Sequence, residues 1–188
     1  MYRRIAVAAL FLCVCLIRAE DKKEEAQKVE EGKPAPDITL EATQIGTVLP
    51  DKKDAKTLSL KDLKGKNVVL YFFPKAMTPG CTKESCAFRD ATAAFAKLDT
   101  VVIGISTDKL DDQMKFTDKE KLNFPLFADP DKKATKAFGA LSDRGFASRY
   151  TFVIDKKGIV RKIYTKVTPA DHPEEVLKYV KENLANGK

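Results

Sequence analysis

The strongest constraint on the fold is a run of six apolar residues, 68–73, that leads directly into the signature of a helix. The run is rich in strand-forming residues and lies between Gly65 and Pro74, as expected for a strand buried on both faces. Thr78 then stands at an N-cap position and Pro79 at the first helical position. A chain that passes from a buried strand into a helix in this way predicts a sheet layered with helices.

The remaining patterns continue this alternation of strands and helices. Further strands are predicted at residues 38–42, 101–106, 124–128, 150–154 and 159–164. Further helices are predicted at residues 110–121, 131–138 and 173–184, and residues 47–56 are expected to form a polar connection or a hairpin tip. Helical crossovers join parallel strands, whereas the turn at residues 155–158 joins antiparallel ones. The prediction is therefore an α/β fold with a central mixed sheet flanked by helices, the thioredoxin-like arrangement.

The first 33 residues differ in composition from the rest of the chain. Arg3 and Arg4 precede thirteen apolar residues, 5–17, which predicts that residues 1–19 are a signal peptide or, if uncleaved, an N-terminal anchor. Residues 20–33 are almost entirely polar or charged and are expected to be a linker to a domain at residues 34–188. The corresponding location is exported: a bacterial periplasm, the outside of the cell, or a eukaryotic secretory lumen.

The charge of the chain does not indicate a polyanionic partner. The sequence has 34 Lys and Arg against 27 Asp and Glu, a net charge of +7, and the predicted signal peptide holds three of the arginines. Acidic residues interleave with the lysines throughout, which is typical of a solvated surface, so no nucleic-acid partner is expected. A phosphate-binding glycine pattern is also missing from the sequence, so a nucleotide cofactor is not expected.

Two cysteines remain in the predicted domain, and their placement indicates redox chemistry. Cys81 falls in the first turn of the helix that follows residues 68–73, where unpaired backbone N–H groups and the helix dipole favour a thiolate. Cys86 follows five residues later. On an intact helix this offset separates the Cα atoms by ~8.7 Å, beyond the ~7 Å limit for a disulfide. Either the two cysteines are never bridged, or the helix unwinds in one redox state.

Other uses of these cysteines fit the sequence less well. A permanent structural disulfide would close a very small loop inside a helix, and zinc would need more ligands than Cys81, Cys86 and His172 supply. A thioredoxin-type exchanger needs the spacing Cys-x-x-Cys. A cysteine hydrolase would need His172, the single histidine, as its base, but its position at a helix start favours capping.

The sequence resembles the peroxiredoxins, in the branch called PrxQ or bacterioferritin comigratory protein, from about residue 29 to residue 184. The most specific stretch is residues 71–90, YFFPKAMTPGCTKESCAFRD. The stretches GKPAPD at 32–37, GISTD at 104–108 and RYTFVID at 149–155 follow in the order and approximate spacing of that family. The segment at residues 139–148 is shorter than in many relatives.

The resemblance assigns roles to five residues. Pro74, Thr78 and Cys81 match the family's Pro-x-x-x-Thr-x-x-Cys peroxide-binding motif, with Cys81 as the peroxidatic nucleophile. Arg149 matches the distal arginine, and Cys86 matches the resolving cysteine of the branch that keeps it in the same helix.

The implied function is a thiol-dependent antioxidant peroxidase that reduces hydrogen peroxide and organic hydroperoxides. Its cycle passes through a sulfenic acid on Cys81, an intramolecular disulfide with Cys86, and reduction by a thioredoxin-like or other dithiol protein. The resemblance implies no cofactor and no metal, and a monomer whose mature domain does not bind membranes. A thioredoxin-fold redox sensor, or a partner-binding module without turnover, is the alternative function.

Overall fold

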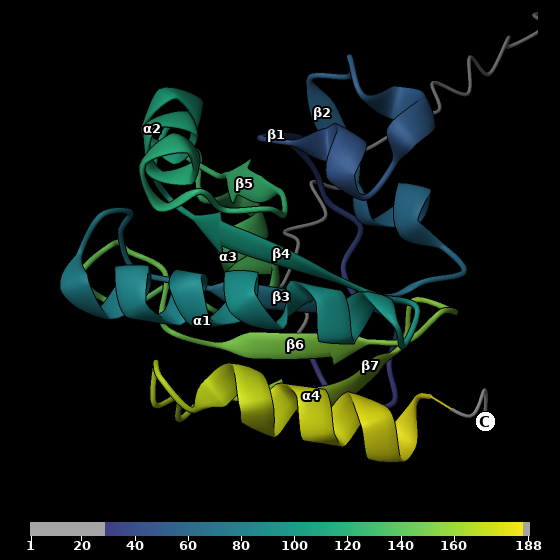
Figure 1. Ribbon diagram of the computed structural model, residues 1–188. Helices are drawn as coiled ribbons and strands as arrows, with labels where there is room; N and C mark the ends of the chain where they lie inside the picture. The colour runs from purple at the N-terminus through teal and green to yellow at the C-terminus, as the bar shows by residue number, and fades with distance from the viewer. Residues whose placement is uncertain (1–28, 186–188) are drawn as a thin grey trace, which may run out of the picture.

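Seven strands form one mixed sheet in the computed structural model, which describes residues 29–185 (Figure 1). Their spatial order is β2-β1-β5-β4-β3-β6-β7. The strands are β1 (Thr39–Ala42), β2 (Thr57–Ser59), β3 (Asn67–Phe72), β4 (Thr100–Ser106), β5 (Leu126–Ala128), β6 (Thr151–Ile154) and β7 (Val160–Tyr164). The predicted thioredoxin-like sheet is confirmed.

The central strand β3 determines how the rest of the sheet is built. It runs parallel to β4, with Tyr71 opposite Gly104, and antiparallel to β6, with Tyr71 opposite Thr151. The β4–β5 pair is also parallel, whereas β1–β2, β1–β5 and β6–β7 are antiparallel. All residues of β3 are buried, as expected for a strand covered on both faces. The carboxyl end of β3 and the start of β6 therefore lie next to each other.

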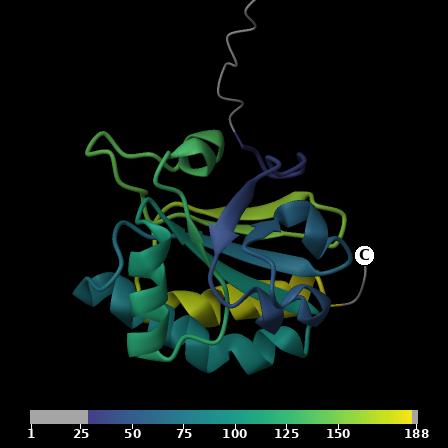
Figure 2. The same ribbon diagram turned by 90° about the horizontal axis from the view of Figure 1, so that it is seen from above.

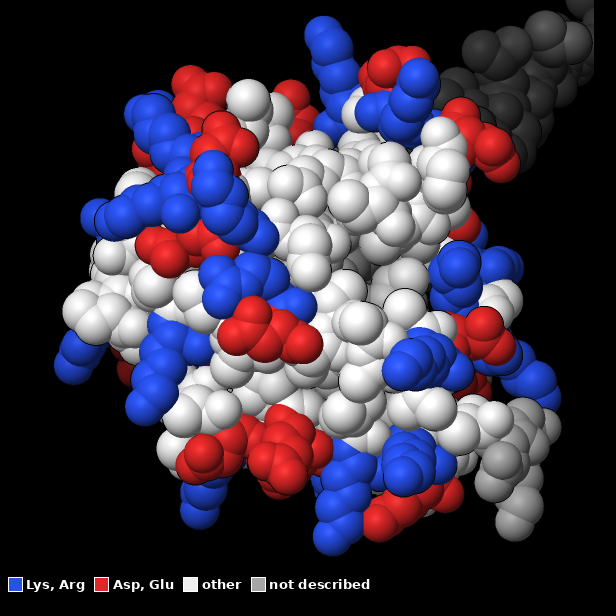
Figure 3. Space-filling view, in the orientation of Figure 1, with Lys and Arg blue, Asp and Glu red and all other residues white. Residues whose placement is uncertain are grey.

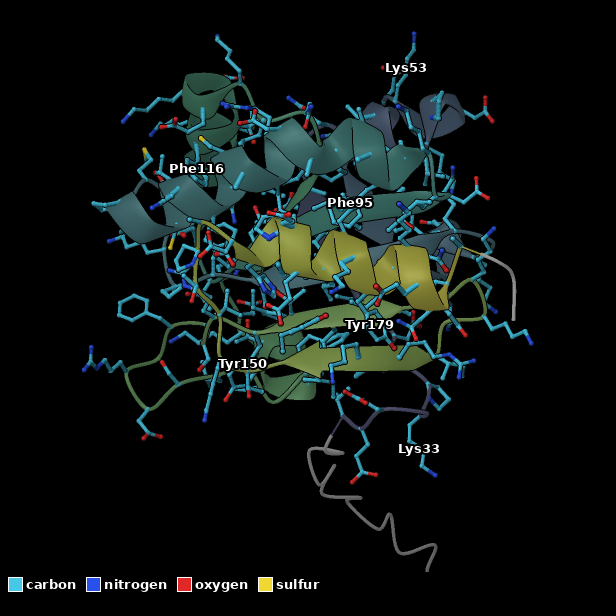
Figure 4. All side chains as sticks on the ribbon, turned by 60° about the horizontal axis from the view of Figure 1, so that its bottom comes forward. Lys33, Lys53, Phe95, Phe116, Tyr150 and Tyr179 are labelled. Atoms are coloured by element: carbon cyan, nitrogen blue, oxygen red, sulfur yellow. The ribbon has the colours of Figure 1, made fainter. Side chains whose placement is uncertain are left out.

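Helices cover both faces of this sheet (Figure 2). α1 (Pro79–Ala96), α2 (Leu110–Glu120) and α4 (His172–Asn183) pack on one face, where their fully buried side chains include Phe88, Phe95 and Phe116. Figure 4 shows this side, with Phe95 and Phe116 labelled. α3 (Lys133–Ala137) packs on the other face beside a second core that contains Phe72 and Phe138. Two hydrophobic layers therefore fix the position of β3 and of the helix that follows it.

The region between β1 and β3 contains more structure than the sequence predicts. Residues 47–56 do connect two antiparallel strands, but Ile45–Thr47 and Pro50–Lys52 form short 3-10 helices. The strand β2, which the sequence analysis did not predict, holds the fully buried Leu58. Three residues are too few to show a period of two, so pairing with β1 rather than the local pattern defines this strand.

The described chain is already part of the fold before residue 34. The Gly32 N–H donates to the Val160 carbonyl at 2.7 Å, and the Ala35 N–H donates to the Gly158 carbonyl at 2.9 Å. The predicted signal peptide at 1–19 and most of the predicted linker lie outside the described residues. Within residues 29–185, the helices lack the combined length and apolar character needed to cross a bilayer.

The visible surface carries charges of both signs close together. Figure 3 shows Lys and Arg next to Asp and Glu over much of this face, with uncharged surface between them. On the protein surface, opposite charges form ion pairs such as Lys52 with Asp62 and Lys156 with Asp99. Exposed pairs of this kind contribute at most about 1 kcal/mol each, so the two cores stabilise the fold far more than the surface charges do.

Candidate active site

Cys81 lies in the first turn of α1, immediately after the loop that leaves β3. Its side chain is 1% exposed and its thiol is free. The first helical hydrogen bond runs from the Thr82 N–H to the Thr78 carbonyl at 2.8 Å. Because Thr78 makes no side-chain cap, the N–H groups of Gly80 and Cys81 have no partner within the helix. The sulfur thus lies at the positive end of a helix of 18 residues.

Thr78 occupies the predicted N-cap position, but its hydroxyl does not cap the helix. With φ −84° and ψ 150° its backbone is extended, as an N-cap requires. Its Oγ1 donates instead to the Lys75 carbonyl at 2.9 Å, a hydrogen bond within the same loop. Met77, just before it, has a left-handed backbone with φ 62°, a conformation that costs about 1–2 kcal/mol for a residue with a side chain. Pro74 begins this loop and is half-buried.

Arg149 is the basic group beside Cys81. It lies just before β6, and the antiparallel pairing of β6 with β3 brings it to the loop although 68 residues separate the two positions. Its Nη2 donates to Cys81 Sγ at 3.3 Å. A methyl group at Gly80 would lie 3.4 Å from that nitrogen, in van der Waals contact, so the guanidinium lies directly beside the helix end. The Arg149 guanidinium is thus the charged group within hydrogen-bond distance of the Cys81 sulfur.

Glu84 is a buried acid that shares the same guanidinium. Arg149 Nη1 pairs with Glu84 Oε2, while Glu84 Oε1 has no hydrogen-bond partner among the described residues. The Glu84 side chain is fully buried, and this burial raises its pKa to about 7, although the charge of Arg149 opposes the rise. The sequence analysis missed Glu84. The available signal was an acid three residues after Cys81, on the helix face that also carries Phe88.

Cys86 lies on the same helix but contacts different groups. Its Sγ is 3.7 Å from Glu120 Oε2 and accepts from Arg89 Nη1 at 3.6 Å. Burial raises the pKa of the Cys86 thiol, Arg89 opposes this effect, and Glu120 adds to it. α1 is continuous from Pro79 to Ala96, so Cys81 and Cys86 are both free thiols here. The structure therefore brings Pro74, Thr78, Cys81 and Arg149 together and places Cys86 on the α2 side of the helix.

His172 is a core histidine and not a partner of Cys81. Its Nε2 lies 2.8 Å from Thr151 Oγ1 and its Nδ1 3.3 Å from Glu175 Oε2. It is the first residue of α4, and its buried ring caps no helix, unlike the expected role. Burial lowers the pKa of His172, and this effect outweighs that of Glu175. The side chain that contacts the Cys81 sulfur is therefore the Arg149 guanidinium, which donates a hydrogen bond, whereas a cysteine hydrolase requires an imidazole base.

The described residues do not form a metal centre. Across residues 29–185, no three His, Cys, Asp or Glu side chains are grouped so that they could hold an ion.

Comparisons with known proteins place this geometry in a family. Residues 32–163 match the model of the AhpC/TSA family. Peroxiredoxin Bcp of Bacillus subtilis is 40% identical over 161 residues, which cover 82% of this chain and 96% of that protein.

Solved structures agree with the sequence comparison. Peroxidoxin BcpB from Mycobacterium tuberculosis superposes with a TM-score of 0.72 at 31% identity, over 82% of this chain and 98% of that one. The bacterioferritin comigratory protein of Xanthomonas campestris, described for its alkyl peroxide reduction activity, gives a TM-score of 0.68 at 27% identity, over 77% and 90% of the two chains. These relatives support peroxidase activity, and nothing among them supports a redox sensor or a binding module without turnover.

The relatives contradict the predicted location. The Bcp proteins of Bacillus subtilis, Escherichia coli and Coxiella burnetii are cytoplasmic peroxiredoxins, so the prediction of an exported protein is wrong. That prediction rested only on two arginines before thirteen apolar residues. Ile17 also stands three residues before the expected cleavage, where a signal peptidase needs a small residue.

The match to the family model covers most of the chain, the Bcp relative is matched over nearly its whole length, and the solved peroxiredoxins share the fold. The chain therefore belongs to the AhpC/TSA family and is a thiol peroxidase of the peroxiredoxin group that includes Bcp and PrxQ.

Proposed function

We propose that Cys81 is the peroxidatic nucleophile of this enzyme and that Arg149, Thr78 and Pro74 form its peroxide-binding site. The observation that carries the proposal is the 3.3 Å contact from Arg149 Nη2 to Cys81 Sγ at the N-terminus of α1. The guanidinium and the unpaired N–H groups of the first turn stabilise a thiolate and also the charge that develops on the peroxide oxygens. Pro74 offers no N–H and fixes the start of the loop.

The first step oxidises Cys81 and cleaves the peroxide. The Cys81 thiolate attacks the terminal oxygen of ROOH, an S–O bond forms, the O–O bond breaks, and the peroxide proton leaves with RO as ROH. The sulfur loses two electrons to the peroxide and becomes a sulfenate, which a proton from solvent converts to the sulfenic acid. Because the Thr78 hydroxyl donates to Lys75, its oxygen keeps lone pairs that accept the O–H of the peroxide.

The substrates are hydrogen peroxide and small organic hydroperoxides. Only the O–O–H group has to reach Cys81, and Gly80 adds no side chain next to the Arg149 guanidinium. The alkyl peroxide reduction described for the Xanthomonas campestris relative supports the organic substrates.

The second step joins Cys81 to Cys86. The Cys86 thiol attacks the sulfenic sulfur, an S–S bond forms, and the hydroxyl leaves as water with the proton of Cys86. The two sulfurs cannot meet while α1 is intact, so the first turns of the helix must unwind. A thioredoxin-like dithiol protein then reduces the disulfide to two thiols and is itself oxidised.

A single chain is sufficient for this cycle, because both cysteines belong to one helix. We therefore propose a monomer that does not depend on a membrane. We place the start of its catalytic domain near residue 34, where Pro34 forms a bridge with Ile159 of the hairpin between β6 and β7.

The proposed cycle is tested by adding one equivalent of hydrogen peroxide to the reduced protein. We expect the unaltered chain to lose two hydrogens and to give a Cys81–Cys86 linked peptide in mass spectrometry. Cys86→Ser should instead stop after one turnover as a sulfenic acid that dimedone labels at Cys81. Continued cycling of Cys86→Ser with thioredoxin at the normal rate would remove Cys86 from the mechanism.

The unwinding of α1 is expected to stop before Arg89. Arg89 Nη1 donates to the Glu120 carbonyl at 2.6 Å, and Asn123 Nδ2 donates to the Arg89 carbonyl at 3.3 Å, so this part of α1 is fastened to the end of α2. Because each helical N–H donates to the carbonyl four residues earlier, hydrogen exchange should increase on oxidation at residues 82–92 and stay nearly constant at residues 93–96. The helix α3, which packs on the opposite face of the sheet, serves as the control. Equal protection of residues 82–92 in both redox states would contradict the unwinding.

A further inference from the structure

We propose that Asp108 is a positioning residue that holds the loop at residues 74–78 in the geometry that binds peroxide. The inference rests on the proposed function and adds a residue to which neither the comparisons nor the sequence analysis gave a role. Asp108 ends the GISTD stretch after β4 and is half-buried beside the loop. It does not contact Cys81 and acts through the backbone of Ala76.

The contact consists of one carboxylate oxygen between two donors. Asp108 Oδ2 accepts from the Ala76 N–H at 2.8 Å and from the Ser106 hydroxyl at 2.7 Å. Ser106 Oγ in turn accepts from Gln113 Nε2 at 2.8 Å, and the same amide nitrogen donates to the Phe127 carbonyl at 3.0 Å. A buried chain of hydrogen bonds thus connects the loop to β4, α2 and β5.

The loop needs an anchor of this kind because its own conformation is unfavourable. Ala76 is buried, and its N–H would have no protein partner without Asp108. The next residue, Met77, has φ 62° and a side chain that is 42% exposed, so its own packing contributes little to holding the left-handed backbone. Thr78, whose hydroxyl faces back to Lys75, follows directly. Releasing Ala76 therefore frees the strained turn that places Thr78.

The expected consequence is a slower reaction of Cys81 with peroxide and an unchanged later cycle. A displacement of about 1 Å in a group that orients a substrate can cost about 10²-fold in rate. The disulfide step and its reduction occur after the first turns of α1 have unwound, so they do not depend on this anchor. A residue that only stabilised the fold would not separate the two half-reactions in this way.

The test compares Asp108→Ala with Asp108→Asn. The amide oxygen of Asn can accept both hydrogen bonds, so Asp108→Asn should keep the rate constant for Cys81 oxidation within about threefold, whereas Asp108→Ala should lower it about 10- to 100-fold. The control is Asp62→Ala, because Asp62 also accepts a backbone N–H, that of Ser59 at 3.1 Å, in a different part of the fold. The chain has no Trp, so oxidation is followed by rapid quenching, thiol alkylation and mass spectrometry.

Each outcome bears on the inference separately from the proposed function. Equal oxidation rates for Asp108→Ala and Asp62→Ala would overturn the inference, as would a parallel loss in the rate at which dithiothreitol reduces the disulfide. If Asp108→Ala does not fold, Ser106→Ala replaces it, because that change removes the donor that orients the carboxylate and should slow oxidation about 3- to 10-fold. A failure of the unaltered chain to react with peroxide would instead refute the proposed function.

Discussion

Replacing Cys81 with Ser is expected to abolish peroxide turnover. A serine hydroxyl beside Arg149 stays protonated at neutral pH and cannot take the oxygen atom of a peroxide, whereas a thiolate can be oxidised reversibly. The substitution removes little volume from the buried site, and the guanidinium keeps its contact with Glu84. The fold should therefore persist, so the loss of activity would report the loss of the sulfur itself.

The control for this change is Cys86→Ser, which removes the other thiol of the same helix. Peroxide consumption in a thioredoxin-coupled assay should fall to the uncatalysed background for Cys81→Ser. Under the same conditions, Cys86→Ser should still consume one equivalent. Turnover by Cys81→Ser at micromolar peroxide would show that another group is the nucleophile and would end the present assignment.

Local patterns were sufficient for the elements that build the site. β3 is fully buried and apolar after Asn67, and α1 begins with Pro79 where the sequence predicts it, because each element is determined by its own residues. β2 was missed because pairing with a neighbouring strand defines it rather than any periodicity. The positions of Pro74, Thr78, Cys81 and Cys86 follow from the same local signals.

The contacts across the sheet could not be read from the sequence in this way. Arg149 was assigned through resemblance alone, because only the antiparallel pairing of β6 with β3 brings it to Cys81. Glu84 and Asp108 were missed for a related reason. The role of each carboxylate depends on its hydrogen-bond donor, which comes from a distant segment of the chain. Glu84 pairs with Arg149, and Asp108 accepts from the Ala76 N–H.

Arg149→Ala is expected to combine a large loss of reactivity with a loss of stability that depends on pH. Cys81 would lose the cation 3.3 Å from its sulfur, and removal of one such donor typically slows a reaction about 10²- to 10³-fold. Glu84 would lose its one polar partner while remaining buried. The loss of reactivity arises at Cys81 and the loss of stability arises at Glu84, so a second substitution at Glu84 can separate the two effects.

The pH dependence follows from the two states of Glu84. In the unfolded chain its carboxyl has the ordinary pKa of 4.5, whereas burial raises it to about 7 in the folded protein. The folded state therefore holds the proton more tightly, and the free energy of unfolding falls as pH rises from 4.5 to 7. Without Arg149 the folded pKa rises further, so Arg149→Ala should lose up to about 1.4 kcal/mol more for each pH unit above 7.

The double variant Glu84→Gln/Arg149→Ala decides between the two roles of the guanidinium. In Arg149→Ala, urea denaturation should show a larger loss of unfolding free energy at pH 8.5 than at pH 6. Because Gln carries no titrating proton, this difference between the two pH values should disappear in the double variant. Peroxide reactivity should stay as low as in Arg149→Ala, because Cys81 still lacks its cation. If Glu84→Gln restored reactivity, Arg149 would serve only to neutralise Glu84. The free energy of unfolding that Arg149→Ala loses relative to the unaltered chain could instead be equal at pH 6 and pH 8.5. Glu84 would then not titrate in this range, and the coupling between the buried acid and the arginine would be refuted.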